Sequence, residues 1–239
     1  MDIAKAPDDV HWALARGYVA ASYARNVAMA DPFRTLGMRA LMLASLENWS
    51  LKTDQFSLVS GSSRPTARKL LKIYADTGLA YMADDAWFAT DLMLSSLDHP
   101  TRAMIDQIEQ CAWPDTEDSD AFRRAVRLGW LRAEYAGTQR LCPIQGRALF
   151  SLLRLHLNQH GADRRRIRNV LQDHTSAIGE DLEPELRRWI LNGWVETSDE
   201  HFFNDRWVVL TPLGQRIATD FIDLLYDCIL QAIRIKPQR

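Results

Sequence analysis

Apolar residues recur every three to four positions along most of the chain, which is the spacing of an amphipathic helix. The pattern predicts helices over 8–29, 33–47, 51–61, 62–78, 92–112, 119–136, 142–159, 163–174, 185–193 and 211–234. The helix over 92–112 is expected to be interrupted at His99-Pro100, because proline lacks a backbone N–H donor. The chain is therefore predicted to be mainly α-helical.

Proline and glycine mark the predicted helix ends. Asp31-Pro32 separates the first two helices, because the residue before a proline avoids the helical conformation. Gly61, Gly78 and Gly193 each follow a helical stretch. Glycine readily adopts the left-handed conformation that ends many helices, so we expect a helix stop at each of the three.

Two segments outside the helical pattern predict small β structure. In LAYMADDAWFATDL, Ala83-Asp84-Asp85 separates two short apolar runs, as in a β-hairpin. In TSDEHFFNDRWVVLTP, a polar turn precedes a strand rich in β-branched residues. Each predicted hairpin follows one of the helix stops.

The segment AWPDTEDSD at 112–120 predicts a linker, because it combines proline with acidic and small polar residues. It divides the chain into a first lobe over 1–112 and a second lobe over 113–239.

The order of elements in the second lobe repeats that of the first. Met38–Leu41 aligns with residues 146–149, and Leu71–Leu79 aligns with Leu186–Trp194. The identity is thin, so the shared order of elements carries the argument for an internal repeat.

The stretch SSRPTARKLLKIYADTGLA, residues 62–80, is the most distinctive of the predicted helices. Ser62 or Ser63 is a good N-cap, and Pro65 suits the first helical turn. The predicted buried stripe consists of Leu70, Leu71, Ile73, Tyr74 and Leu79. The side left exposed carries Arg64, Thr66, Ala67 and Lys69, flanked by Arg68 and Lys72, and no acid occurs from 62 to 75.

Three helices, a glycine stop and a hairpin form the layout of a winged helix-turn-helix. The sequence here resembles the MarR-like winged-helix transcription regulators. Ser63–Arg68 is similar to the start of a recognition helix in that family and Asp76–Leu79 to its end, while Asn204–Gly214 resembles the wing and the start of the next helix. The resemblance implies a recognition helix in the major groove, a wing near the phosphates and a dimer built from terminal helices.

The expected fold is thus mainly α with small β-hairpin wings, arranged as two winged helix-turn-helix lobes joined by long outer helices. Arginine can contact guanine bidentately, and threonine or alanine can touch a thymine methyl group. Lysine and the capping serine are expected to hold phosphates. The candidate DNA-binding residues are Ser62, Ser63, Arg64, Thr66, Ala67, Arg68, Lys69, Lys72, Arg164, Arg165 and Arg206. The alternative for each basic run is a solvated cationic helix face.

The two lobes differ in charge where they would meet DNA. The first hairpin is acidic at Asp84 and Asp85, where a wing would favour arginine. In the second lobe, the segment SAIGEDLEPELRRW is acidic where the first lobe is basic, and its Glu180 and Asp181 would be repelled by phosphates. The sequence therefore predicts that the lobes do not have the same role.

The net charge of −2 excludes a chain that binds nucleic acid over its whole surface, so any DNA contact must come from a local patch. The three cysteines are far apart, as expected for reduced thiols. The N-terminal segment has no apolar signal core and no run is apolar enough to cross a membrane. We therefore expect a cytoplasmic protein without membrane contact.

The sequence offers little chemistry. His156 and His160 have a spacing that can place two metal ligands on one helix face, but no third ligand lies nearby in the sequence, so a solvated pair is favoured. No phosphate-binding loop, dinucleotide motif or nucleophile elbow occurs. The eight tryptophans could line a pocket for a small-molecule effector or simply pack in the core. We expect no enzymatic activity, cofactor or metal.

Three functions remain after these exclusions. The first is a sequence-specific DNA-binding transcriptional regulator with its recognition helix at 63–77 and double-stranded DNA as its partner. The second is a replication-initiator-like DNA binder. The third is a winged-helix protein-interaction scaffold without DNA binding. In the first two, the long outer helices would form either an internal pseudo-dimer within one chain or a homodimer.

Overall fold

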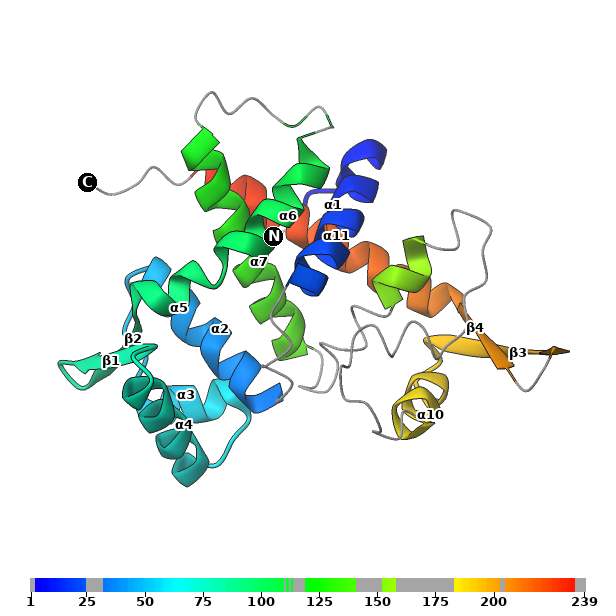
Figure 1. Cartoon of the computed structure of the whole chain (residues 1–239). Coiled ribbons are helices and arrows are strands. Elements are labelled where there is room, and N and C mark those ends of the chain that lie inside the picture. The colour runs from blue at the N-terminus through cyan, green and yellow to red at the C-terminus, as the bar shows by residue number, and fades with distance from the viewer. Residues whose placement is uncertain are drawn as a thin grey trace.

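Long helices fill the centre of the molecule, and each end carries a short helix beside a two-stranded hairpin (Figure 1). The computed structural model describes residues 3–24, 32–109, 111, 113, 119–140, 152–157, 183–202 and 205–234. Its elements are α1 (Asp8–Ala24), α2 (Pro32–Leu46), α3 (Thr53–Ser60), α4 (Arg64–Asp76), β1 (Ala80–Ala83), β2 (Ala86–Ala89), α5 (Asp91–Ser95), α6 (Asp98–Ile108), α7 (Ser119–Arg140), α10 (Glu183–Leu191), β3 (Val195–Phe202), β4 (Asp205–Leu210) and α11 (Pro212–Arg234). The expected fold class, mainly α with small antiparallel strand pairs, is confirmed.

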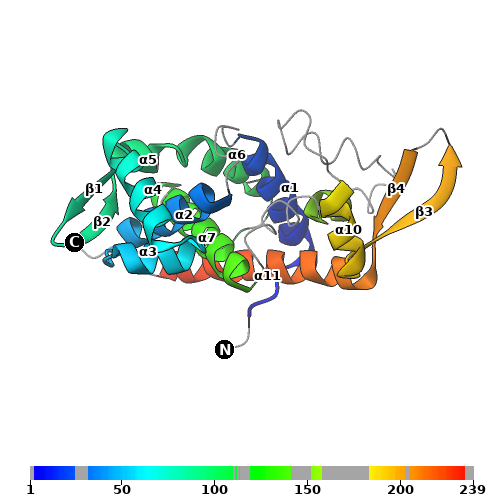
Figure 2. The ribbon, with the colours of Figure 1, turned by 90° about the horizontal axis from the view of Figure 1, so that it is seen from below.

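The two hairpins lie at opposite ends of an elongated molecule (Figures 1 and 2). Helices α2 to α5 gather around the β1–β2 hairpin at one end. Helix α10 and the β3–β4 hairpin form the other end, and α1, α6, α7 and α11 lie between them. The four central helices therefore connect the two ends of the molecule.

Two predicted boundaries are wrong. The break in the helix over 92–112 falls at Ser96 and Leu97, between α5 and α6. His99 and Pro100 lie in the first turn of α6, where a missing backbone N–H forfeits no helical hydrogen bond. The expected polar turn after Gly193 is instead strand β3, which pairs with β4 through an irregular register between Ser198 and Phe202.

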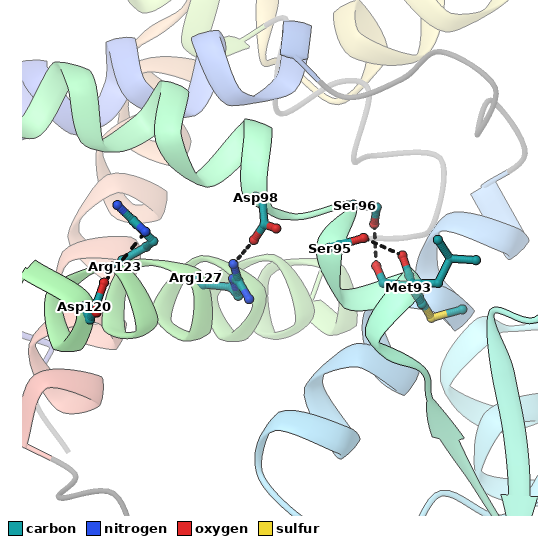
Figure 3. Close-up of polar contacts among 8 residues, drawn as sticks. Met93, Ser95, Ser96, Asp98, Asp120, Arg123 and Arg127 are labelled. Atoms are coloured by element: carbon teal, nitrogen blue, oxygen red, sulfur yellow. Dashed lines mark hydrogen bonds and ion pairs between the residues drawn. The ribbon is translucent and has the colours of Figure 1, made fainter.

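The junction of α5 and α6 is fixed from both sides (Figure 3). Ser96 Oγ donates a hydrogen bond to the backbone oxygen of Met93 over 2.6 Å, which satisfies an end of α5. Asp98, at the start of α6, forms an ion pair with Arg127 of α7. The acid also suits the positive end of the α6 dipole.

One hydrophobic core spans the predicted linker. It includes Val10 of α1, Leu41 of α2, Met104 of α6, Trp130 of α7 and Ile229 of α11, each less than 5% exposed. Helices from the regions 1–112 and 113–239 therefore share their apolar faces. A smaller second core lies under the β3–β4 hairpin and consists of Leu152, Leu155, Trp189, Trp194, Val195, Val208 and Leu210.

The central helices form two similar pairs. Helix α1 packs along α6, and α7 packs along α11. A glycine permits each close approach: a Cβ on Gly17 would lie 3.1 Å from the Met104 Cγ, and a Cβ on Gly129 would lie 2.5 Å from the Ile229 Cγ1.

The segments around these glycines are also similar in sequence. Residues 15–24 read ARGYVAASYA and residues 127–136 read RLGWLRAEYA. The match of glycine, aromatic, alanine and tyrosine-alanine positions was overlooked in the sequence analysis, although it is the clearest trace of the repeat. It makes α1 the counterpart of α7 and α6 the counterpart of α11.

The contacts between the two helix pairs show the same correspondence. Helix α1 contacts α11, and α6 contacts α7. The first contact includes an edge-to-face pair of Tyr18 and Phe221, whose ring centroids are 5.0 Å apart. The second includes the ion pair of Asp98 and Arg127. Such reciprocal contacts are the mark of a two-fold interface.

A buried carboxylate ties α1, α2 and α7 together. Glu134 of α7 is 2% exposed. It accepts a hydrogen bond from Tyr18 Oη over 3.1 Å, and its Oε2 lies 2.8 Å from Arg39 Nε of α2. A second ion pair, of Glu47 and Arg132, joins the turn directly after α2 to α7. These polar contacts fix α2 against the centre.

We predict that Gly129→Ala destabilises the protein by about 2 kcal/mol more than Gly17→Ala. The added methyl group at 129 overlaps Ile229, and overpacking typically costs about 1–3 kcal/mol. Both glycines lie inside helices, so the higher helix propensity of alanine, about 1 kcal/mol, applies to both variants, and their difference reflects the milder crowding at 17. Urea unfolding followed by circular dichroism measures both variants. Equal losses would contradict the tight α7–α11 contact.

Candidate nucleic-acid interface

Helix α4 begins as the sequence predicts. Ser63 is the N-cap, with φ −66° and ψ 154°, and its Oγ accepts a hydrogen bond from the backbone N–H of Thr66 over 3.4 Å. Ser62 has a different task, because its Oγ lies 2.7 Å from Ser60 Oγ in the turn that closes α3. Gly61 in that turn has the left-handed φ of 64°. The Ser63 cap thus fixes the residue at which α4 begins after the α3–α4 turn.

The buried side of α4 consists of Ala67, Leu70, Leu71 and Tyr74. These positions follow the i, i+3, i+4, i+7 spacing of one helix face. The expectation that Ala67 is exposed is therefore wrong: its exposed fraction is 0%, and it cannot reach a base. The small side chain instead lets α4 pack closely on its neighbours.

The opposite side of α4 is cationic and open to solvent. Its exposed residues are Arg64, Pro65, Thr66, Arg68, Lys69, Lys72, Ala75 and Asp76. Within the described part of the chain, Arg68, Lys69 and Lys72 form no ion pair. Arg64 differs, because its Nε lies 2.6 Å from Asp54 Oδ1 of α3. Exposed cations without a protein carboxylate are suited to an external anion.

The β1–β2 hairpin is held beside α3 by a third extended residue. Leu51 forms an isolated bridge with Trp87, whose N–H donates to the Leu51 oxygen over 2.9 Å. Trp87 Nε1 also donates to Thr53 Oγ1 over 3.1 Å. Sequence reasoning missed this contact, since a single bridging residue has no periodic pattern.

The tip of this hairpin is a tight acidic turn. Asp84 and Asp85 have φ of 49° and 61°, and positive φ at both positions is what a two-residue type I′ turn requires. Asp85 lies 3.8 Å from Lys52 Nζ. The hairpin tip therefore carries net negative charge, with Lys52 as the neighbouring cation.

The end of α4 is joined to its hairpin by a small hydrogen-bond network. Gly78, with φ of 71°, ends the helical region, and the N–H of Leu79 donates to the Tyr74 oxygen over 2.8 Å. After the hairpin, the N–H of Thr90 donates to the Leu79 oxygen over 2.9 Å, and Thr90 Oγ1 donates to the Gly78 oxygen over 2.8 Å.

The same network recurs at the end of α10. Gly193 has φ of 68°, and the N–H of Trp194 donates to the Trp189 oxygen over 3.0 Å. The N–H of Thr211 donates to the Trp194 oxygen over 3.0 Å, and Thr211 Oγ1 donates to the Gly193 oxygen. In this respect α10 and the β3–β4 hairpin are built as α4 and the β1–β2 hairpin are.

The second end differs in its exposed side chains. Arg187 and Arg188 of α10 are exposed. They align with Lys72 and Ile73 of the first lobe and were not predicted as site residues. Leu191 of α10 is 84% exposed. Among the side chains that the structure describes, the exposed ones of α10 are two arginines, Ile190 and Leu191, whereas α4 exposes four cations.

The remaining predicted site residues are placed only in part. Arg164 and Arg165 lie outside the described residues. Arg206 lies on β4, and only its backbone is described. The structure therefore brings Ser63, Arg64, Thr66, Arg68, Lys69 and Lys72 together on one helix, with Ser62 in the preceding turn and Ala67 buried.

The one histidine of the predicted pair that is described has a protein partner. His156 is buried, and its Nε2 lies 3.0 Å from Nε2 of His11 on α1. Trp12 stacks on His156 with centroids 4.6 Å apart. Among the described residues, no group of three or more His, Cys, Asp or Glu side chains could hold a metal ion.

Burial of His11 makes the stability of the folded protein depend on pH. Desolvation lowers the pKa of His11, and the nearby Asp223 and Asp8 carboxylates partly oppose this. The unfolded chain then binds a proton more readily than the folded one as pH falls below about 6.5, so stability is complete above that value and declines below it.

We therefore predict that the urea midpoint falls between about pH 7 and about pH 5.5, and that His11→Gln reduces this decline. Midpoints measured across the range, with the exposed His99→Gln as a control, check the effect. An identical decline in both variants would contradict it.

Comparisons with protein-family models, curated proteins and solved structures found no match to this chain. No helix within the described ranges is both long and apolar enough to cross a membrane.

Proposed function

We propose that this protein is a sequence-specific transcriptional regulator that binds double-stranded DNA, with α4 as its recognition helix. The observation that carries the proposal is the exposed side of α4. It presents Arg64, Thr66, Arg68, Lys69 and Lys72 without an acid before Asp76. Arginine and lysine on the leading part of an exposed helix suit both base edges and phosphates.

The surroundings of α4 support a winged-helix unit. Helix α2, the bridging residue Leu51, helices α3 and α4, and strands β1 and β2 follow one another in the chain order of that fold. The hairpin packs beside α3, because Leu51 and Thr53 both contact Trp87 of β2. In this reading β1 and β2 form the wing.

Each exposed residue of α4 then has a chemical role. Arg64 and Arg68 would contact guanine, and Thr66 would touch a thymine methyl group or a phosphate. Lys69 and Lys72 would hold phosphates of the flanking backbone. Such a protein acts where the genome is accessible, so a cytoplasmic location belongs to the same proposal.

The central helices support an internal pseudo-dimer. The pairs α1–α6 and α7–α11 are equivalent, and the contacts α1–α11 and α6–α7 exchange with one another. Helices α4 and α10 lie along the same edge of the molecule, at opposite ends (Figure 1). One chain would thus present two related winged-helix units to one duplex, without a partner chain.

The α10 surface favours a second candidate, a protein-interaction role for the second unit. Ile190 is 37% exposed and Leu191 84% exposed, at positions that align with Ala75 and Asp76 of α4, respectively. Exposed apolar side chains at the end of a helix suit a protein surface better than a phosphate backbone. This candidate would act alongside DNA binding by the first unit.

The first prediction tests the DNA face directly. Replacing Arg68, Lys69 and Lys72 by alanine should weaken binding to random duplex about tenfold or more. It should lower the salt slope by about 2, since Lys69 and Lys72 hold phosphates and each phosphate contact contributes about 0.9. Fluorescence anisotropy at several salt concentrations measures both quantities.

The matched control replaces Lys5, Arg102 and Arg124 by alanine. These substitutions remove the same total charge from exposed positions outside α4. Its binding should stay close to that of the unchanged protein. Equal losses in the two triple variants, or salt-independent binding, would contradict the assignment of α4.

The acidic turn gives a prediction of opposite sign. Asp84→Asn combined with Asp85→Gly removes two negative charges and supplies Asn-Gly, the preferred type I′ pair. We expect tighter duplex binding, about threefold or more at low salt, with unchanged or higher stability. Weaker binding by a folded variant would show that the turn does not face DNA.

The pseudo-dimer predicts a single chain in solution. Light scattering at micromolar concentration should give about the chain mass of 27.4 kDa. A mass of twice that value would favour the homodimer instead.

A further inference from the structure

Four consecutive residues before and within α3 contact the β1–β2 hairpin or the start of α4. The Leu51 oxygen accepts from the N–H of Trp87, and Thr53 Oγ1 accepts from Trp87 Nε1. Lys52 lies within ion-pair distance of Asp85 at the hairpin tip. Asp54 pairs with Arg64 in the first turn of α4. The segment 51–54 thus joins the hairpin and the candidate recognition helix.

The Asp54–Arg64 contact has a specific geometry. The Asp54 Oδ1 atom lies 2.6 Å from Nε of Arg64, which is the inner nitrogen of the guanidinium group. The ion pair is made at Nε, and neither outer nitrogen, Nη1 or Nη2, donates a hydrogen bond to a described residue. The Arg64 side chain is 60% exposed. Its free end is therefore available to a ligand that offers two acceptors.

Asp54 itself is well placed to hold an arginine. It lies in the first turn of α3, where the helix dipole favours a carboxylate. The start of α3 is closed by a capping contact, in which the N–H of Lys52 donates to Gln55 Oε1 over 2.7 Å. Because the segment also carries the hairpin contacts, the position of Asp54 is fixed by its neighbours on both sides.

We propose that Asp54 is a positioning residue for sequence recognition, which orients Arg64 so that Nη1 and Nη2 face O6 and N7 of a guanine. This inference rests on the proposed function. An exposed ion pair is too weak to trap Arg64, but it limits the rotamers that the side chain samples before binding. Guanine presents two adjacent acceptors in the major groove, and a bidentate arginine distinguishes it from the other bases.

The rival role for Asp54 is simple repulsion of DNA by a carboxylate near the interface. The two roles make different predictions. Repulsion lowers affinity for every duplex alike, whereas positioning acts only where Arg64 contacts a guanine. Removal of the charge therefore separates them, provided that affinities for a selected sequence and for random sequence are both measured.

The experiment compares two probes: a duplex pool selected from random sequence by the unchanged chain, and the unselected random pool. Asp54→Asn should reduce the affinity ratio between the pools about tenfold, within the range of one bidentate contact. Its affinity for the random pool should stay level or rise, since a negative charge is lost. The urea midpoint of each variant verifies folding.

Asp76→Asn is the matched control, because it removes the same charge from an exposed position at the other end of α4. It should leave the affinity ratio unchanged. Arg64→Lys keeps the positive charge but loses the two-nitrogen fork, so it should lower the ratio as Asp54→Asn does. The double variant should be no less selective than Arg64→Lys alone, because both changes remove one contact.

Three results would overturn the inference. If Asp54→Asn changes both affinities by the same factor, Asp54 acts only through its charge while the proposed function stands. If the double variant loses the product of the single losses, the two residues act independently. If the unchanged chain shows no salt-dependent duplex binding, the proposed function fails and this inference fails with it.

Discussion

The buried carboxylate of Glu134 is the contact on which the placement of the first unit depends. It joins Tyr18 of α1 and Arg39 of α2 to α7 in the middle of the shared core. Loss of one partner of a buried ion pair typically costs about 3–5 kcal/mol, because the other charge is left without compensation. Helix α2 is therefore fixed in direction, and the α3–α4 pair that follows it inherits that direction.

The close helix pairs at Gly17 and Gly129 give the same centre its approximate two-fold character. Each glycine lets a long helix approach its partner at nearly backbone contact. Since α1 and α7 correspond, and α6 and α11 correspond, the two ends of the molecule are placed by equivalent helices. The two ends of the molecule can therefore differ in their exposed side chains while packing on the central helices in the same way.

Local patterns predicted most of the fold. The helices over 33–47, 62–78 and 211–234 follow from apolar spacing, and the first hairpin follows from two short runs around an acidic turn. Non-local contacts were out of reach. Nothing in the sequence pairs Leu51 with Trp87, and nothing predicts that Asp54 meets Arg64 across the α3–α4 turn.

The candidate site was also predicted from local patterns, and only the expected exposure of Ala67 is wrong. The cap, the proline and the basic residues are properties of one helix, so the sequence identifies them. The phase of that helix was misjudged at Ala67, because a small side chain gives a weak signal for either face. Because Ala67 is buried, the proposed base contacts fall to the longer side chains, with Arg64 and Arg68 the best suited.

The central claim is that the exposed side of α4 enters the DNA groove. Site-specific photocrosslinking tests it most directly, with a photoreactive amino acid at position 69 in one variant and at position 102 on α6 in another. We predict a covalent adduct with duplex DNA at position 69 and none at position 102. An adduct at 102 without one at 69 would contradict the account.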